Sequence, residues 1–477
     1  MNIDVMLINA NRYMPPVAPL GLEFLCQTLE KADLWYTVVD LCFVESIFQT
    51  LKTAFDKVTP GLVGVTFRNL DDSNLVSDFS FFPHFDIIIK LIKGFTKSPI
   101  VLGGSGFSIA PSGILERTGA EYGIVGDGER PLVELTQALK DGRQPSQIPG
   151  LVYRCDGGVV VNPPAWGNIS QEPLSFHIFD YERYFREGAY IGIETKRGCP
   201  RQCCYCVDSL GKGTTVRTRA PEVVTHEMFS LVKRGINVFN FCDSEFNVDL
   251  YHAKKVCSVL IKHNAASALS WICSCTPKPF TDELASLMRL AGCNAINFNL
   301  ERKDFWFSGG SKYNSVFDEI KDAIKYCKQY DIKAMISVIV GGPGESPATV
   351  SEVIHSLKIL KPTCIGVNLG VRIYPNTELY DLLGLTSNKH ELDIDNGFHG
   401  YIKDNDDLVM PIFYISPKLG DDPWQLIQKL IGDNNRFLFP KPNDENNVST
   451  IALHEAIQRG HLGAYWEIAL QVKNEQM

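Results

Sequence analysis

The sequence has little that would place the chain in a membrane or in an oxidising compartment. It contains no run of about 18 apolar residues, the length that a membrane-spanning helix requires. The nearest candidate, residues 79–95, is interrupted by Pro83, His84, Asp86, Lys90 and Lys93. The start of the chain also lacks a basic run followed by an apolar core, the pattern of a secretory signal. We therefore expect no membrane association and a cytoplasmic location.

An excess of positive charge is missing as well. Lysine and arginine number 46 and aspartate and glutamate 55, so the net charge is −9. Proteins that bind nucleic acid non-specifically usually carry a basic face, so the balance argues against a nucleic-acid partner. With 45% hydrophobic and 21% charged residues, the composition is that of an ordinary globular protein and excludes global disorder.

Internal repeats and low-complexity segments are absent, and so is the GxGxxG motif of NAD- and FAD-binding folds. The length of 477 residues predicts two to four domains at roughly 150 residues each. In the first 145 residues, apolar strand-like runs alternate with helical patterns. Strands are expected at 5–9, 36–40, 62–66, 100–102 and 122–125, and helices at 21–31, 85–95 and 130–140. This alternation predicts an α/β domain, residues 1–145, with a doubly wound parallel sheet.

The remainder of the chain predicts a second α/β unit. A connector, residues 146–185, carries a hairpin signal and several prolines. Strands near 191–195, 238–242, 270–273, 295–299, 334–340 and 365–371 follow. Six strand–helix steps indicate a partial (β/α)6 barrel over residues 186–390. A small mixed segment, residues 391–477, ends the chain, with helical patterns near 422–431 and 450–472.

The most specific feature is a cysteine loop, residues 198–206 (GCPRQCCYC), directly after the first strand of the second series. Cys199, Cys203 and Cys206 have CxxxCxxC spacing, which suits three irons of a [4Fe–4S] cluster and leaves the fourth iron open. Structural zinc is the competing interpretation, but it normally takes four ligands, and no second CxxC or CxxH pair is present. The third interpretation is that the three cysteines are buried and bind no metal. Cys204 is expected to point into the core.

On these residues the sequence resembles the radical S-adenosylmethionine (SAM) enzymes over roughly residues 185–400. The resemblance implies that the open iron binds SAM and that Tyr205 packs beside its adenine. Further strand-end residues match segments that face SAM in that family: Asp243, Glu245, Glu301, Gly342 and Arg372. The alternative interpretations are that Asp243 or Ser244 caps a helix and that Arg372 is a structural arginine.

The first domain resembles the cobalamin-binding domains of cobalamin-dependent radical SAM enzymes, closest to the thiostrepton-type tryptophan methylase group. The resemblance implies cobalamin contacts at strand ends and helix starts. These are Pro19, Leu20, Arg68, Asn69, Gly103, Gly104, Ser105, Gly106, Gly126, Asp127, Gly128 and Glu129. Glycines in such places allow the backbone to approach a large ligand closely.

One departure concerns the metal of cobalamin. Many cobalamin proteins ligate cobalt through the histidine of DxHxxG, yet none of the ten histidines lies two residues after an aspartate. The resemblance instead implies that Arg68 approaches the lower face of cobalt and blocks ligation there. The alternative is that Arg68 caps the sheet or pairs with Asp71 or Asp72. The resemblance also implies Arg68, Tyr205 and Glu301 as catalytic residues.

The resemblance predicts a methyltransferase that moves a methyl group from SAM through methylcobalamin to an unactivated carbon or phosphorus of a small molecule or peptide. Three alternatives stay open. The same architecture can perform cyclisation or rearrangement, or it can transfer an aminocarboxypropyl group from SAM without cobalamin. The third alternative is a metal- or cobalamin-binding sensor without catalytic turnover. The residues expected to face SAM argue against it, because a sensor does not need them. An external electron donor such as flavodoxin or ferredoxin is implied as a partner.

A second group of cysteines includes Cys273 and Cys275, whose spacing places both side chains on one face of a strand, and Cys293 further along the chain. These thiols could bind a soft metal, but core packing is the favoured interpretation.

Overall fold

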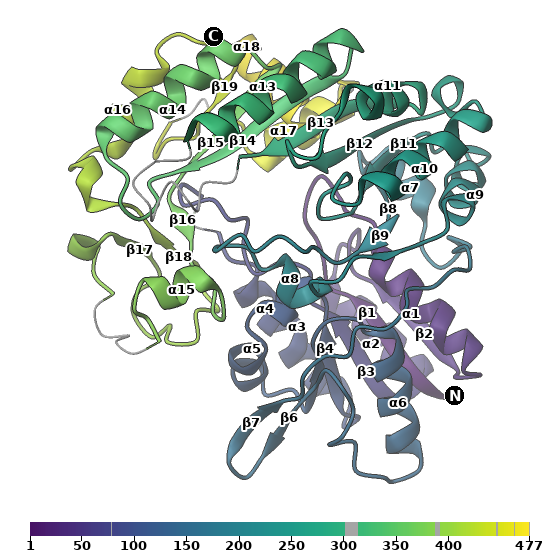
Figure 1. Ribbon diagram of the computed structural model, residues 1–477. Coiled ribbons are helices and arrows are strands. Elements are labelled where there is room, and N and C mark those ends of the chain that lie inside the picture. The colour runs from purple at the N-terminus through teal and green to yellow at the C-terminus, as the bar shows by residue number, and fades with distance from the viewer. Residues whose placement is uncertain (78, 301–312, 387–391, 445–446, 462, 477) are drawn as a thin grey trace.

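Two seven-stranded sheets build the molecule. The computed structural model describes the chain except for residues 78, 301–312, 387–391, 445–446, 462 and 477. In Figure 1 the first sheet, from the N-terminal part, lies below, and the second arches above it in green and teal. The short helix α8, Asp208–Lys212, lies between the two. The two sheets therefore face each other across the middle of the molecule.

The first sheet has the strand order β2-β1-β3-β4-β5-β6-β7. Its parallel strands are β1 Asn2–Asn9, β2 Tyr36–Asp40, β3 Thr59–Thr66, β4 Ile100–Gly103 and β5 Tyr122–Ile124. Its helices are α1 Leu20–Lys31, α2 Ile47–Lys57, α3 Phe82–Phe95, α4 Ser105–Ile109, α5 Pro111–Thr118 and α6 Glu129–Lys140. The central strands are apolar because helices cover both faces. The order in which successive strands are added reverses between β1 and β3, because β2 lies on one side of β1 and β3 on the other.

The predicted hairpin of the connector adds to this sheet. Strands β6, Leu151–Cys155, and β7, Gly158–Val161, pair antiparallel at its edge, next to β5. The first sheet is therefore mixed, where the sequence analysis expects only parallel strands. Antiparallel strands commonly complete the edge of a parallel sheet, because a hairpin needs only a short turn and no covering helix.

The second sheet has the order β19-β15-β14-β13-β12-β11-β8 and all of its strands are parallel. They are β8 Ile191–Ile193, β11 Val238–Phe241, β12 Ser270–Cys275, β13 Cys293–Asn299, β14 Lys333–Val340, β15 Cys364–Leu369 and β19 Phe437–Leu438. The first six agree with the predicted strands. The outer helices are α7 Tyr181–Arg186, α9 Pro221–Val232, α10 Leu250–Lys262, α11 Asp282–Leu290, α13 Tyr313–Gln329 and α14 Pro347–Leu360.

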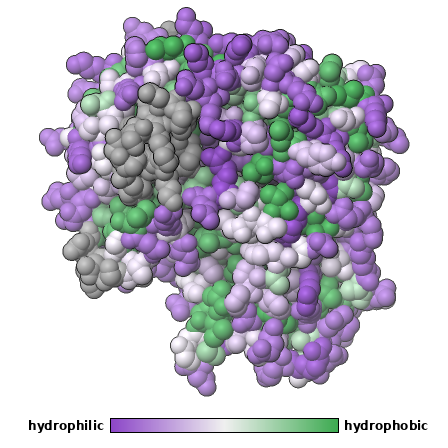
Figure 2. All heavy atoms as spheres, in the orientation of Figure 1, coloured by the Kyte–Doolittle hydropathy of each residue, from purple (hydrophilic) through white to green (hydrophobic). Residues whose placement is uncertain are grey.

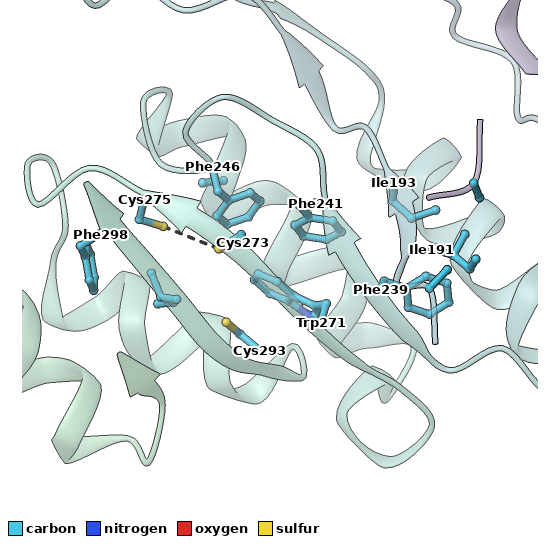
Figure 3. Close-up of a cluster of buried hydrophobic side chains, with 14 of the residues drawn as sticks. Ile191, Ile193, Phe239, Phe241, Phe246, Trp271, Cys273, Cys275, Cys293 and Phe298 are labelled. Atoms are coloured by element: carbon cyan, nitrogen blue, oxygen red, sulfur yellow. Dashed lines mark hydrogen bonds between the residues drawn. The ribbon is translucent and has the colours of Figure 1, made fainter. Parts of the chain in front are cut away.

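The core of the second sheet is aromatic (Figure 3). Trp271 is fully buried and stacks on Phe241 with 4.5 Å between ring centroids. Cys273, Cys275 and Cys293 lie in the same core, and the sulfurs of Cys273 and Cys275 are 3.7 Å apart. Burial raises the pKa of both thiols well above the usual value. The predicted core role of these cysteines is confirmed.

The last part of the chain closes one end of the second sheet. A small antiparallel sheet joins β16 Val371–Arg372, β18 Ile412–Tyr414 and β17 Phe398–Gly400, with α15 Glu378–Leu382 beside it. Helices α16 Pro423–Ile431, α17 Thr450–Gln458 and α18 Tyr465–Gln476 follow. Helix α18 contacts β15 and β19.

The surface carries no extended apolar band on the face seen in Figure 2, where hydrophobic residues stand in small separate groups. Across the described parts of the chain, no helix is both long and apolar enough to cross a membrane.

Candidate functional site

A cavity of about 410 Å³ lies between the two sheets. Its floor consists of the carboxyl ends of β1, β3, β4 and β5, and its wall on the other side comes from β8, β11 and the helix α8. Leu7 and Asn9 of β1 and Thr66 of β3 line it. The cavity therefore occupies the point where the strand order of the first sheet reverses, the place at which open α/β sheets bind ligands.

Most of the residues predicted to contact cobalamin line this cavity. They are Pro19, Leu20, Arg68, Gly103, Gly104, Ser105, Gly126, Asp127, Gly128 and Glu129. Asn69 and Gly106 are not among the lining residues. They lie against each other instead, since a Cβ on Gly106 would come within 2.9 Å of the Asn69 backbone.

The glycines of β4 shape a cradle for a ligand. A side chain at Gly103 would meet no protein atom within 4 Å, so it would extend into free space. Gly104 has φ +102°, and a Cβ there would lie 2.8 Å from the carbonyl oxygen of Phe67. The backbone can approach a large ligand at Gly103, and only glycine fits at Gly104.

Arg68 reaches into the cavity from the loop after β3. Its Nη1 donates to Oδ1 of Asn69 at 3.1 Å. Burial between the sheets lowers the pKa of Arg68. Electrostatic interactions with Cys242, Tyr13 and Tyr465 act in the opposite direction and raise it. The predicted alternative of an ion pair with Asp71 or Asp72 does not hold, because Asp71 pairs with Arg372 at 2.8 Å and Asp72 accepts from the Ser77 hydroxyl. The side chain of Arg68 lines the cavity.

The sequence analysis missed the residues with which the second sheet lines the cavity. Tyr190, Asn240, Cys242 and Lys212 belong to this wall. Burial raises the pKa of the Cys242 thiol to about 11. The sequence offered one signal for Cys242, namely its position directly after the strand β11. That this residue faces the first sheet could not be predicted, because it depends on contacts between segments far apart in the sequence.

The cysteine loop starts beside this wall at a glycine whose conformation disfavours any other residue. Gly198 has φ +97°, and a Cβ there would collide with the carbonyl oxygen of Thr215. The backbone N–H of Cys199 donates to the Gly213 carbonyl at 3.0 Å, and that of Cys206 to the Cys203 carbonyl at 3.0 Å. The loop is thus a fixed turn that presents its three spaced cysteines on one short stretch of chain.

The thiols of this loop differ in burial. Cys204 is 1% exposed and packs in the core of the small antiparallel sheet, as predicted. Tyr205 packs against the same core. Burial raises the pKa of Cys199, and it raises that of Cys206 to about 11. As placed, no three His, Cys, Asp or Glu side chains of the described residues form a metal-binding group. The expectation of a cluster site therefore depends on the three cysteines that the loop supplies as possible ligands.

Asp243 is engaged within the protein. Its carboxylate accepts from Lys196 Nζ at 2.7 Å and from the Thr195 N–H at 2.9 Å. The side chains of Asp243 and Lys196 are each 1% exposed. The alternative that Asp243 or Ser244 caps a helix is wrong, because Asp249 caps α10.

Glu245, two residues further on, keeps an oxygen available. Its Oε1 accepts from Asn299 Nδ2 at 3.4 Å, whereas the buried Oε2 has no partner among the described residues. Burial raises the pKa of Glu245 to about 7, and the charge of Glu245 contributes to the raised pKa of Cys199. An unsatisfied buried carboxylate oxygen beside the cysteine loop is a candidate contact for a bound cofactor.

Two further predicted SAM contacts are held by internal bonds. The N–H groups of Gly341 and Gly342 donate to Oε2 of Glu345 at 2.6 and 2.8 Å. Arg372 donates to Asp71 and to the Leu408 carbonyl. Glu301 lies outside the described residues.

Comparison with known proteins relates this geometry to a family. The radical SAM superfamily matches residues 193–357, which contain the cysteine loop. Over 97% of the chain and 95% of the relative, the sequence is 29% identical to tryptophan 2-C-methyltransferase from Streptomyces laurentii. An uncharacterized methyltransferase from Pyrococcus horikoshii is 27% identical over 76% of the chain and 78% of its own length.

Solved structures extend the similarity to the whole fold. The radical SAM methyltransferase TsrM from Kitasatospora setae, with cobalamin and a [4Fe–4S] cluster bound, matches with a TM-score of 0.85 and 27% identity, covering 99% of this chain and 98% of that one. TsrM with tryptophan and a SAM analogue matches with a TM-score of 0.86 and 28% identity, at the same coverage. The cobalamin-dependent radical SAM enzyme OxsB shares the fold, with a TM-score of 0.67 at 18% identity over 86% of this chain and 64% of that one. The chain is thus similar to TsrM in sequence and in fold over almost its whole length.

Proposed function

We propose that the chain is a cobalamin-dependent radical SAM methyltransferase that acts on a small molecule. The observation that carries the proposal is the cavity at the reversal point of the first sheet, whose opposite wall belongs to the radical SAM domain. Similarity to TsrM over 99% of the chain supports it. The proposed domains are those of the sequence analysis: residues 1–145, 146–185, 186–390 and 391–477.

Cys199, Cys203 and Cys206 would hold the [4Fe–4S] cluster, and the lining residues of the cavity would hold cobalamin. The cluster supplies an open iron for SAM and one electron, and cobalamin supplies a metal that accepts a methyl group and passes it on. Cys206 would have to give up its thiol proton when the cluster binds, because burial raises the pKa of this thiol to about 11. Metal binding to cysteine releases that proton.

Arg68 would act on the cobalamin side. As a guanidinium that lines the cavity, it would keep other ligands away from the metal of a bound cobalamin and oppose the build-up of positive charge there. Cationic arginine cannot itself coordinate a metal, since its pKa keeps it protonated even though burial lowers it. A neutral residue at position 68 would leave room for water or another ligand.

The SAM side of the site would use different residues. Tyr205 would lie beside the adenine, and the free Oε2 of Glu245 would accept a hydrogen bond from the amino group or ribose of SAM. Glu345 would hold the turn of Gly342 in shape through two backbone hydrogen bonds. For Asp243 and Arg372 we propose positioning roles, because their charged groups are already paired within the protein.

The substrate would enter between the sheets. Tyr190 lines the cavity and stacks on Tyr465 of α18, with 4.5 Å between ring centroids. An aromatic wall of this kind suits a flat, apolar substrate ring. Tryptophan is the first substrate to test, since TsrM has been solved with it. An external electron donor such as flavodoxin or ferredoxin would reduce the cofactors.

The test is an anaerobic assay of the reconstituted chain with tryptophan, a reductant and SAM whose methyl group carries deuterium. We expect a tryptophan product that carries the labelled methyl group, and S-adenosylhomocysteine as the by-product. Cys199→Ala is expected to abolish the product, whereas Cys155→Ala, at an exposed cysteine outside the loop, is the matched control. Cleavage of SAM without methyl transfer to any small-molecule substrate tried would overturn the proposal.

A further inference from the structure

Arg197 ties the cavity loop, residues 126–129, to the start of the cysteine loop. Its Nη1 lies 2.8 Å from Oδ1 of Asp127 and 3.0 Å from Oε1 of Glu129. Its Nε and Nη2 donate to the two oxygens of Glu194 at 3.0 and 2.9 Å. Arg197 stands two residues before Cys199, so one guanidinium joins a cobalamin-facing loop to a cluster-facing loop.

Arg217 and Trp166 make a second connection between the same two loops. Arg217 donates to Asp127 and to the Lys212 carbonyl, the latter at 2.7 Å. Its guanidinium lies over the Trp166 ring at 5.4 Å from the centroid. The indole is wedged between two glycines, since a Cβ on Gly126 or on Gly213 would come within 2.8 Å of it. Gly126 lines the cavity, and Gly213 directly follows α8, the helix that comes after the cysteine loop.

The leading end of the cysteine loop is therefore held against the cavity by two contacts. One is made by Arg197, and the other by Gly213, whose carbonyl accepts from the Cys199 N–H at 3.0 Å. A movement of residues 126–129 on ligand binding would be passed to the cysteines by direct contact. Packed interfaces of this kind shift as units and do not deform continuously.

These contacts are shielded from water, unlike most surface ion pairs. The side chains of Arg197 and Asp127 are 11% and 14% exposed, and those of Glu129 and Glu194 are 24% and 12% exposed. Bidentate, charge-assisted hydrogen bonds in such places are strong and geometrically specific. Three carboxylates surround two arginines, so the loss of one arginine leaves negative charges facing one another.

We propose that Arg197 and Trp166 are positioning residues that couple occupancy of the cavity to the cysteine loop, so that cobalamin and the cluster strengthen each other's binding. This inference rests on the proposed function. Coupling between two sites is reciprocal: if the cluster tightens cobalamin binding by some factor, cobalamin tightens cluster binding by the same factor.

The experiment measures the dissociation constant of hydroxocobalamin for the full chain before and after reconstitution of the cluster. For the unmodified chain we expect at least about fivefold tighter binding with the cluster, the lower end of typical coupling. Arg197→Met is expected to reduce that ratio to less than twofold. Trp166→Ala is expected to act in the same direction without disturbing any charge, and it keeps the test open should the arginine variant fail to fold.

Two matched substitutions separate coupling from general damage. Arg130→Met removes an arginine that is 73% exposed on the neighbouring helix, and Trp35→Ala removes a tryptophan that is 67% exposed. Both are expected to keep the ratio of the unmodified chain. A purely structural role would weaken hydroxocobalamin binding equally with and without the cluster, and the ratio would not change.

The inference is overturned if the unmodified chain shows no difference between the two states, or if Arg197→Met and Trp166→Ala both retain its ratio. The proposed function fails differently: hydroxocobalamin then binds in neither state. A chain that binds hydroxocobalamin and iron but shows no coupling would leave the proposed function standing and remove only this inference.

Discussion

Arg372 and Asp71 form a buried ion pair that joins the loop after β3 to the small antiparallel sheet. Their side chains are 4% and 1% exposed, and Nε lies 2.8 Å from Oδ2. Removing one partner leaves the other charge buried without compensation, which costs about 3–5 kcal/mol. We predict that Arg372→Met lowers the free energy of unfolding by this amount, measured by denaturant titration of the chain without cofactors.

The control for this prediction is Arg143→Met. Arg143 and Asp141 form an ion pair whose side chains are 60% and 58% exposed. Exposed pairs contribute about 0–1 kcal/mol, so the control is expected to unfold near the midpoint of the unmodified chain. Equal effects of the two substitutions would show that the pair at Arg372 is not the buried link described.

Glu23 of α1 predicts a pH dependence of stability. The residue is 2% exposed, and burial raises its pKa to about 7 from an ordinary value near 4.5. A carboxyl with a raised pKa in the folded state holds its proton more tightly there than in the unfolded chain. Its contribution to stability is therefore complete below about pH 4.5 and is lost as the pH rises through about 7, a change of about 3 kcal/mol.

The measurement compares the unfolding free energies of Glu23→Gln and the unmodified chain between pH 4.5 and 8. The variant is expected to gain relative stability as the pH rises, by about 3 kcal/mol over the range. Glu116→Gln, at an exposed glutamate, is expected to show no such gain. A constant difference between the Glu23 variant and the unmodified chain would contradict the raised pKa.

At the scale of residues, the sequence predicts which side chains could bind a cofactor better than it predicts which side chains pair with each other. The positions of Cys199, Cys203 and Cys206 follow from spacing alone, because the loop is local. The pairing of Asp243 with Lys196 brings together residues 47 positions apart and could not be anticipated. The same holds for Arg372, whose carboxylate partner lies 301 positions away.

At the scale of elements, the parallel strands could be predicted because strands buried on both faces are continuous apolar runs. Helix α2 was not assigned, although Ile47, Leu51 and Phe55 repeat at helical spacing. Strand β19 has only two residues, Phe437 and Leu438, and its place beside β15 depends on tertiary contacts. The edge position of the hairpin β6–β7 likewise required the folded sheet.

Gly198 is the element-scale position where the cysteine loop is most sensitive. With φ +97° and the Thr215 carbonyl in the path of any Cβ, alanine would force the loop to change shape. Strain of this kind costs about 1–3 kcal/mol. We predict that Gly198→Ala lowers the iron content after anaerobic reconstitution by about tenfold, corresponding to about 1.4 kcal/mol.

Gly211 is the matched control within the same segment. A Cβ there would meet only Ser108 Cβ, at an ordinary 3.7 Å. Gly211→Ala is therefore expected to bind iron like the unmodified chain. Similar iron content in the two variants would mean that the turn at Gly198 does not shape the loop for the cluster.

At the scale of the whole molecule, the cavity is the property that no segment carries by itself. Its lining runs from Leu7 of β1 to Cys242 beyond β11. The sequence predicts the two α/β units and, through resemblance, most residues of the cradle. It could not predict that Tyr190, Lys212 and Cys242 form the opposing wall, because that wall exists only when the two sheets face each other.

The most direct test of this account is the cofactor content of the full chain after anaerobic reconstitution with iron, sulfide and cobalamin. We predict about four irons per chain, from one cluster, and about one cobalamin. The triple variant Cys199→Ala, Cys203→Ala, Cys206→Ala is expected to lose the iron and still bind cobalamin supplied in excess, since the two groups occupy different residues. Iron without cobalamin, or neither cofactor, would contradict the account.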